Sequence, residues 1–394
     1  MTYSKWVACW GNATSITDRR EATFAKNLTL RYPVRIVFAG SHLRFRFSNL
    51  TGTEDVCLTK ASVMLQPLSS DIPNAEDASS NVDSKSVATF ITFSGKRDVV
   101  IKPGTEVESD AIDFPVEAGQ QVVVSMYFAD YTQMNAGTLI TGPLSKGQYS
   151  YGDFCDAETL PLDLTRNTNW FYFLNTIDVL TEEQNHALVC YGDSITAQSW
   201  PDYLAIRLWE EGRRDVAIIR RAVSGTRILR QYDCITYQAY GLKGATRFPI
   251  ELNVAGASAV IIQHGINDII HPVGVDVNPF RPWSDMPQLE DLVLGMEKLY
   301  VQHARSLGLK VWAGTLLPIY GWRTYDAQRD LLRESFNDWM RQSALFDGVI
   351  DFDQAVRYPA FPAAFAPGFD SGDHLHPSEA AYKAMADAVP VDVL

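Results

Sequence analysis

The sequence predicts a two-domain protein in which an all-β domain of jelly-roll or sandwich type, residues 1–183, precedes a doubly wound α/β domain, residues 184–394. The length of 394 residues suits about two domains. Short runs of β-branched and aromatic residues, separated by turns and without a helical period, fill the first half. Apolar runs then alternate with amphipathic segments, which predicts a flavodoxin-like parallel sheet of five strands with helices on both faces.

Composition excludes several classes of protein. The net charge of −13 argues against nucleic acid or an anionic membrane as the partner. No run of 18 or more apolar residues predicts a transmembrane helix. Residues 1–12 lack the pattern of a signal peptide, so we expect a cytoplasmic protein, although a secreted form whose signal was removed would have the same sequence. Five scattered cysteines without a Cys-x-x-Cys motif predict reduced thiols rather than a disulfide framework or a zinc site.

The first half consists mainly of strand patterns. Residues 43–47 alternate apolar and polar side chains, as a half-buried strand does. The apolar run 34–38 precedes them, and Ala39-Gly40-Ser41 between the two runs predicts a hairpin turn. Residues 67–86 are polar and predict a long exposed loop. Further strands are expected over residues 87–93, 99–101 and 122–128, with turns at Pro103-Gly104 and Ala118-Gly119.

The second half alternates strands with helices. A serine, Ser378, follows a proline and predicts the N-cap of a final helix that runs through residue 388. The five strands are expected over residues 187–191, 216–219, 259–263, 310–315 and 348–351. The other helices are expected over residues 200–211, 288–307 and 327–342, the second of them clearly amphipathic.

Polar residues follow the first three strands of this sheet. Ser194 follows the first strand, Gly225 the second and Asn267 the third, while Asp373 and His376 lie just before the last helix. Because the carboxyl ends of parallel strands open on one edge of the sheet, we expect these five residues to converge.

These residue types fit nucleophilic catalysis. A serine hydroxyl is a poor nucleophile until a base removes its proton, and a histidine suits that task at neutral pH. Asp373, three residues before His376, has the spacing to orient its imidazole ring. The N–H groups of Ser194 and Gly225 and the amide of Asn267 have the character of oxyanion donors.

Each motif also has a structural interpretation. Gly-Asp-Ser is a common turn, and Asp193 suits a role in bonding backbone N–H groups better than a role as an acid. Asp268 is expected to brace its own loop. His374-x-His376 with Asp373 resembles metal-ligand spacing, but no second cluster of ligands accompanies it, so we expect no metal and place His374 outside the triad.

Taken together, the motifs resemble the SGNH hydrolase superfamily, also called GDSL esterases. They are Gly192-Asp193-Ser194-Ile195, a glycine after the second strand, Gly265-Ile266-Asn267-Asp268 and Asp373-His374-Leu375-His376-Pro377. Three further stretches resemble a two-domain branch with an N-terminal β-sandwich, namely residues 6–10, 29–31 and 43–49. The resemblance implies Ser194 as nucleophile, His376 as base, Asp373 as orienting residue and Ser194, Gly225 and Asn267 as oxyanion donors, without metal or cofactor.

Candidate substrate contacts carry less information. Trp200 stands in a segment where the superfamily commonly has a glycine, so we expect it to narrow the entrance to the serine. His264, Tyr320 and Trp322 lie near the same edge of the sheet. Trp283 is a further candidate substrate contact. Arg227 and Arg247 are expected to form ion pairs, and Cys190 is expected to be buried.

We therefore expect a serine esterase that releases short acyl groups, acetyl above all, from a carbohydrate through an acyl-enzyme. The carbohydrate preference follows from the resemblance and the accessory β domain. The alternatives are a general aryl or lipid esterase, a thioesterase, and a carbohydrate-binding protein with a vestigial site. The expected partner is an acylated carbohydrate or another small ester, and the sequence does not indicate an oligomeric state.

Overall fold

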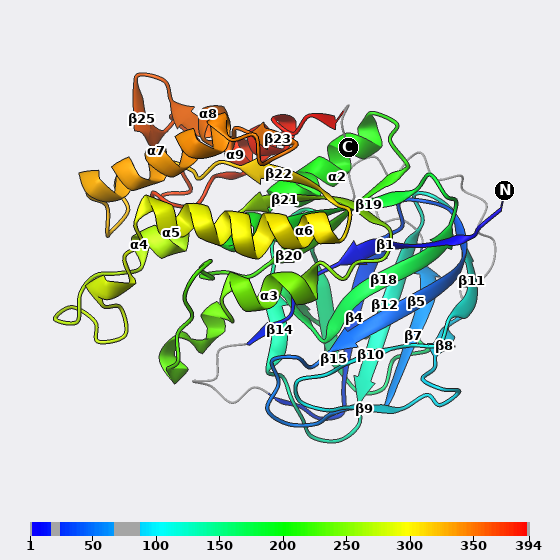
Figure 1. The fold of residues 1–394 in the computed structure, drawn as a ribbon. Coiled ribbons are helices and arrows are strands. Elements are labelled where there is room, and N and C mark those ends of the chain that lie inside the picture. Colours follow the sequence, from blue (N-terminus) through cyan, green and yellow to red (C-terminus); the bar gives the residue numbers. More distant parts are fainter. Residues whose placement is uncertain (1, 17–23, 67–86, 392–394) are drawn as a thin grey trace. The chain divides into compact units, whose positions relative to one another are not determined.

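A computed structural model describes residues 2–16, 24–66 and 87–391 (Figure 1). The chain forms two compact units, one of Met1–Ala187 with Leu208–Ile219 and the other of Leu188–Arg207 with Arg220–Leu394. The expected boundary between residues 183 and 184 stays a prediction, and the expected loop 67–86 lies outside the described residues.

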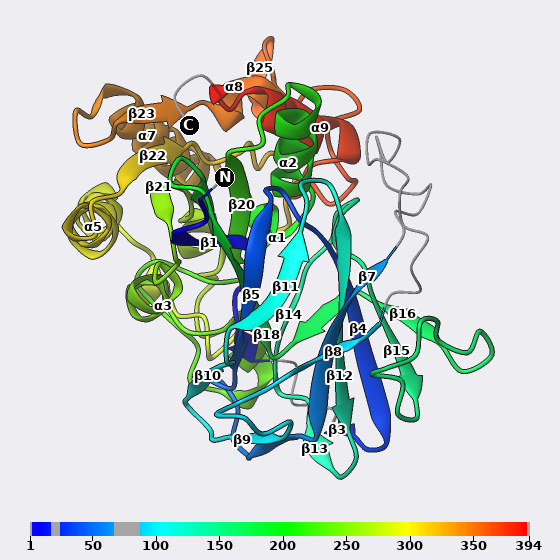
Figure 2. The same cartoon turned by 90° about the vertical axis from the view of Figure 1, so that its right-hand side faces the viewer.

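The first unit contains two large antiparallel sheets (Figure 2). Phe128 of one sheet packs against Phe173 with ring centroids 5.6 Å apart, and Phe47 of the other packs against Phe93 at 5.6 Å. The five-stranded sheet contains β1 (Lys5–Gly11), β18 (Leu174–Thr181), β5 (Gly40–Ser48), β10 (Glu106–Glu108) and β11 (Ile112–Val116). The six-stranded sheet has the order β16 (Arg166–Thr168), β15 (Gly147–Tyr151), β4 (Leu28–Arg35), β12 (Gln121–Phe128), β7 (Lys60–Gln66) and β8 (Thr89–Ile91).

Short strands complete this unit. They pair as β13 (Thr132–Gln133) with β3 (Phe24–Ala25), β14 (Ala136–Leu139) with β17 (Trp170–Tyr172) and β2 (Ser15–Ile16), and β6 (Val56–Leu58) with β9 (Val99–Ile101). Among the described residues that precede Ser194, no helix is found, which agrees with the missing helical period.

The hairpin predicted at residues 39–41 is wrong. Strand β4 pairs with β12 and β15, whereas β5 pairs with β18, β10 and β11, so the two strands belong to different sheets. The connection carries Ile36 and Phe38, and both are buried. Because apolar residues at these positions favour the core over an exposed turn, the chain crosses from one sheet to the other.

The chain after residue 185 is built on a five-stranded parallel sheet with helices, as predicted. The spatial order 2-1-3-4-5 is the flavodoxin-like order, in which ligands bind at the carboxyl edge. The second strand is three residues longer than expected, because Arg220 is buried within it and pairs with Asp202 at 2.5 Å. The strands in spatial order are β20 (Val216–Ala222), β19 (His186–Gly192), β21 (Ala257–Gln263), β22 (Lys310–Gly314) and β23 (Gly348–Ile350).

Helices cover the sheet, with α2 and α9 on one face and α3 and α5 on the other (Figures 1 and 2). The helix expected over 288–307 contains a π-helical segment, Gly295–Val301, where Ile228 and Leu229 pack against the Gly295 backbone. The helices are α1 (Ser194–Ala197), α2 (Trp200–Glu210), α3 (Gly244–Glu251), α4 (Ile266–Ile270), α5 (Leu289–Leu294), α6 (Gln302–Ser306), α7 (Ala327–Gln342), α8 (Phe352–Val356) and α9 (Glu379–Asp387). The described part of the chain contains no helix that is both long and apolar enough to span a membrane.

Candidate active site

Ser194 stands at the carboxyl end of strand β19. The strand ends at Gly192, where a Cβ would lie 2.4 Å from the backbone oxygen of Gln263, so only glycine fits. Asp193 then caps helix α1, and its carboxylate accepts a hydrogen bond from the Ile195 N–H at 3.1 Å. The predicted turn-holding role of Asp193 is thus confirmed, and Ser194 begins the helix.

His376 and Asp373 come from one closed loop before helix α9. The Ser378 hydroxyl caps that helix and also donates to the Gly368 carbonyl at 2.8 Å. Backbone bonds from Ser378 N to Phe369 O at 2.8 Å and from Ser371 N to His376 O at 3.0 Å close the loop. Hydrogen bonds within the loop therefore hold the backbone that carries both Asp373 and His376.

The structure brings the predicted triad together. His376 Nε2 lies 2.8 Å from Ser194 Oγ, and His376 Nδ1 lies 2.6 Å from Asp373 Oδ2. The other carboxylate oxygen of Asp373 accepts from the backbone N–H groups of His376 at 2.8 Å and Leu375 at 2.9 Å. With Nδ1 donating to Asp373, Nε2 is free to accept the serine proton.

Asp373 is held in its charged form. Partial burial opposes its ionisation, but the hydrogen bonds from the His376 ring and from the backbone N–H groups of His376 and Leu375 outweigh burial and lower its pKa below the ordinary value. The carboxylate is therefore ionised at neutral pH and orients the imidazole ring of His376.

His374 points elsewhere. It has a left-handed backbone with φ of 65°, is half-exposed, and its Nδ1 lies 2.5 Å from Asp370 Oδ2. The two histidines of this loop thus bond different carboxylates, so they do not converge on a shared metal. Within residues 2–16, 24–66 and 87–391, no group of three or more His, Cys, Asp or Glu side chains is arranged to hold a metal ion.

Gly225 lies in the loop after strand β20, and Asn267 lies in helix α4 after strand β21, at the same edge of the sheet. Gly225 has φ of 77°, and a Cβ there would lie 2.2 Å from the Tyr240 ring, so the position requires glycine. Asn267 is 3% exposed, and its side-chain amide donates to the Thr226 carbonyl at 3.1 Å. That bond uses one of two amide protons and ties Asn267 to the residue after Gly225. Their oxyanion role stays a prediction.

A buried network holds Thr226. Its hydroxyl accepts from Arg247 Nη1 at 2.9 Å, and Arg247 pairs with Glu251 at 2.8 Å. His264 Nε2 lies 3.0 Å from the Thr226 carbonyl, and His264 Nδ1 lies 2.8 Å from the Tyr300 hydroxyl. Burial, helped by the nearby Arg247 charge, lowers the pKa of His264 to about 3, so the ring is neutral.

His264 therefore does not contact substrate, and the prediction that it does is wrong. It is 1% exposed, and both ring nitrogens are engaged inside the domain. Its place directly after strand β21 puts it under the site, where it supports the loop of Gly225 and Thr226.

The prediction for Trp200 is also wrong. Its side chain is fully buried, packs against Phe352 with ring centroids 5.2 Å apart and donates to Thr196 Oγ1 at 3.4 Å. Trp200 is the first residue of α2, and this helix turns its apolar face, Trp200 included, toward the core. It does not narrow the entrance to Ser194.

Tyr320 and Trp322 stay candidate substrate contacts. The glycine between them, Gly321, lies against His374, because a Cβ there would be 2.7 Å from His374 Cγ. Tyr320 is 47% exposed and meets Phe361 edge-on at 4.7 Å. The loop thus adjoins the histidine loop and presents an aromatic side chain to solvent.

Asp268 was predicted to brace its own loop, but it braces the neighbouring one by accepting from the Ile228 N–H at 2.7 Å and the Leu229 N–H at 3.1 Å. Two other predicted structural roles are confirmed. Arg227 pairs with Asp285 at 3.0 Å, and Cys190 is fully buried. Trp283 is exposed and lies beside Gly274 and the Arg329 guanidinium.

Three tyrosines that were not predicted as site residues lie beside the loop of Gly225 and Thr226, which is called the oxyanion loop below for its proposed role. Tyr232, Tyr237 and Tyr240 form the tyrosine cluster, with ring centroids 4.7 to 5.7 Å apart. Tyr240 is the residue whose ring lies against Gly225. Three tyrosines within nine residues of a segment without strand pattern were the available signal.

Asp193 supplies a prediction on pH. It is fully buried, Oδ2 has no hydrogen-bond partner among the described residues, and burial raises its pKa to about 7. Between about pH 4 and 7 the native state therefore holds a proton that the unfolded chain has released, so this group lowers stability as pH rises. Asp193→Asn keeps the cap acceptor without the charge.

We expect Asp193→Asn to become more stable relative to wild type as pH rises, with the difference growing by about 3 kcal/mol between pH 4.5 and pH 8. Urea unfolding at the two pH values measures this. Asp268, whose pKa burial raises to about 6, titrates in both proteins, and its charge contributes to the raised pKa of Asp193. A difference between the proteins that does not change with pH would contradict the prediction.

Comparison with known proteins adds a family match to this geometry. Residues 190–384 match the family described as GDSL-like Lipase/Acylhydrolase family. No curated protein sequence matches the chain.

Solved structures resemble the chain at low identity. A family two carbohydrate esterase from Cellvibrio japonicus is 11% identical over 98% of this chain and 96% of its own, with a TM-score of 0.35. An active-site mutant of a family two carbohydrate esterase from Clostridium thermocellum is 13% identical over 99% of this chain and 93% of its own, with a TM-score of 0.34. An α/β hydrolase from the metagenome of Lake Arreo, Spain, is 19% identical over 52% of this chain and 92% of its own, with a TM-score of 0.39.

Proposed function

Because residues 190–384 form a domain of the GDSL-like lipase/acylhydrolase family, we propose that this protein is a serine esterase that removes short acyl groups, acetyl above all, from carbohydrate esters. The observation that carries the proposal is the continuous hydrogen-bonded row of Ser194 Oγ, His376 and Asp373, with distances of 2.8 and 2.6 Å. A serine, an imidazole and a carboxylate in this order are the parts of an activated nucleophile.

The chemistry follows from these positions. Ser194 Oγ attacks the ester carbonyl carbon while His376 Nε2 takes its proton, and Asp373 stabilises the imidazolium that forms. The N–H groups of Ser194 and Gly225 and the amide of Asn267 bind the oxyanion. His376 then protonates the departing alcohol, an acyl-enzyme remains, and water attacks it with His376 again as base to release the carboxylic acid.

The preference for acetyl and for carbohydrate rests on the resemblance to the SGNH superfamily. The aromatic surroundings support it, since Tyr240 adjoins the oxyanion loop and Tyr320 stands exposed near the histidine loop. Aromatic side chains in such places suit stacking on sugar rings, which present a C–H face between their hydroxyl groups.

A panel of esters tests the proposal. Acid release from acetylated oligosaccharides, p-nitrophenyl acetate, p-nitrophenyl esters of longer acids and an acyl thioester would be compared for the wild type and Ser194→Ala. We expect kcat/KM to be highest for the acetylated oligosaccharides and to fall as the acyl chain lengthens. Preference for long acyl chains or for the thioester would favour those alternatives, and binding of oligosaccharide without turnover would favour a vestigial site.

A further inference from the structure

A cavity of about 750 Å³ lies beside the tyrosine cluster. It has the size of a small-molecule site and mixes aromatic with hydrogen-bonding side chains. Phe280, one of its walls, is 48% exposed. The polar lining side chains include Gln231, Asp233, Lys243 and Thr246, so donors and acceptors stand together.

The tyrosine cluster connects this cavity with the oxyanion loop by ring contacts. Tyr240 lies against Gly225 and stacks with Tyr237 at 5.6 Å. Tyr237 in turn meets Phe280 edge-on at 6.4 Å and Tyr232 at 4.7 Å, and the last two line the cavity. Asn278 fixes the Tyr237 hydroxyl with a hydrogen bond of 2.6 Å. The aromatic surface is thus continuous from the proposed oxyanion donors to the cavity.

Tyr232, which lines this cavity, has a buried hydroxyl. The residue is only 8% exposed, and its hydroxyl has no hydrogen-bond partner among the described residues. The Arg227 guanidinium covers its ring at 4.4 Å from the centroid, which holds the side chain in place. A buried hydroxyl without a partner is costly, so a ligand that bonds it gains a favourable contact.

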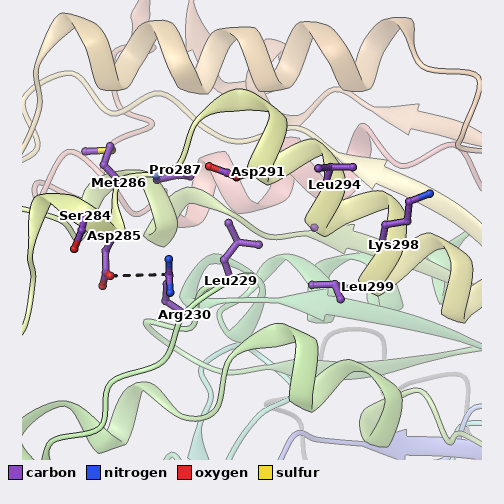
Figure 3. Close-up of a pocket in the computed structure, with 11 residues that line it drawn as sticks. Leu229, Arg230, Ser284, Asp285, Met286, Pro287, Asp291, Leu294, Lys298 and Leu299 are labelled. Atoms are coloured by element: carbon purple, nitrogen blue, oxygen red, sulfur yellow. Dashed lines mark ion pairs between the residues drawn. The ribbon is translucent and has the colours of Figure 1, made fainter.

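A second cavity of about 450 Å³ adjoins the first one, and Figure 3 shows the residues that line it. The two share Leu229, Arg230 and Asp285, and the Arg230 and Asp285 side chains face each other in Figure 3 with a closest charged contact of 3.9 Å. Leu229 and Met286 contribute apolar walls beyond that pair. The two adjoining cavities are called the groove below, and their adjacent positions suit a ligand longer than one sugar unit.

We propose that this groove binds the carbohydrate chain of the ester, with Phe280 and Tyr232 as specificity-determining residues that hold sugar units remote from the scissile bond. The inference rests on the proposed function and deepens it, because it assigns the leaving alcohol to an oligosaccharide rather than to a small alcohol. Aromatic ring surface together with side chains that both donate and accept hydrogen bonds matches a chain of hydroxylated rings. Binding energy gained there favours long substrates over short ones.

The test compares long and short substrates. Phe280→Ala removes an exposed ring, Tyr232→Phe removes only the hydroxyl, and Phe24→Ala is the matched control, since Phe24 is 57% exposed and contacts Tyr131 at 5.3 Å in the other unit. We expect Phe280→Ala to lower kcat/KM for acetylated oligosaccharides about 10-fold and Tyr232→Phe about 5-fold, while p-nitrophenyl acetate is hydrolysed at wild-type rates. Phe24→Ala should change neither.

Binding measurements separate this inference from the proposed function. Calorimetric titration of the Ser194→Ala variant with unacetylated oligosaccharide should show binding that Phe280→Ala weakens. If the wild type cleaves acetylated oligosaccharides and the variants cleave them equally well, the groove does not bind the carbohydrate chain, but the proposed function still holds. If the wild type cleaves only aryl acetate and the Ser194→Ala variant binds no oligosaccharide, both the groove and the proposed function are wrong. Equal losses on long and short substrates would also overturn the groove.

Discussion

Ser194→Ala is expected to lower kcat for ester hydrolysis about 10⁶-fold without loss of folding. The serine hydroxyl is the group that His376 can activate, because Nε2 lies 2.8 Å from Oγ and Asp373 holds the other ring nitrogen. Without the hydroxyl no acyl-enzyme forms, and the residual rate comes from substrate binding and the oxyanion donors alone. Steady-state hydrolysis of p-nitrophenyl acetate and the thermal midpoint would be measured together.

Ser199→Ala is the matched control for this change. Its hydroxyl donates to Glu379 at 2.9 Å instead of facing His376, so we expect kcat within a few-fold of wild type. Equal hydrolysis by the wild type and Ser194→Ala would contradict the serine mechanism.

Asn267→Ala is expected to lower kcat by about 10²–10³-fold and to leave KM nearly unchanged. The amide would bind an oxygen whose negative charge develops in the transition state, so its loss is felt there and not in the ground state. The thermal midpoint should change little, because the Thr226 carbonyl keeps its bond to His264 Nε2 at 3.0 Å.

A second asparagine of the same domain separates catalysis from stability. Asn337 is buried and bonds both the N–H and the carbonyl of Leu316, at 2.7 and 2.8 Å. Asn337→Ala should therefore lower the thermal midpoint while kcat of the folded fraction stays unchanged. If Asn267→Ala behaves in the same way as Asn337→Ala, the structural interpretation of Asn267 is right and the oxyanion role is wrong.

Much of the α/β domain was predictable because periodic patterns are strong there. The helix expected over 327–342 is α7 with the same bounds, and Ser378 is the cap that its position after a proline indicated. The convergence of Ser194, Asp373 and His376 followed from one rule, that strand ends of a parallel sheet share an edge.

The wrong predictions concern residues whose packing partners are distant in the sequence. Trp200 was expected at the entrance because of its place near Ser194, but its ring lies against Phe352, far along the sequence. His264 was a candidate substrate contact, but both of its ring nitrogens are engaged by Thr226 and Tyr300 inside the domain. The chain that links β4 and β5 has turn-forming residues, yet Ile36 and Phe38 draw it across the core. A local sequence pattern does not reveal packing contacts between residues that are distant in the chain.

The closed loop of residues 368–378 has a consequence for how activity arises during folding. Asp373 and His376 are three residues apart, so their contact closes early and at little entropic cost. Ser194 and His376 are 182 residues apart, so their contact requires the finished sheet and the docked loop. Recovered esterase activity therefore reports completion of long-range assembly, a stage that helical content measured by circular dichroism does not distinguish.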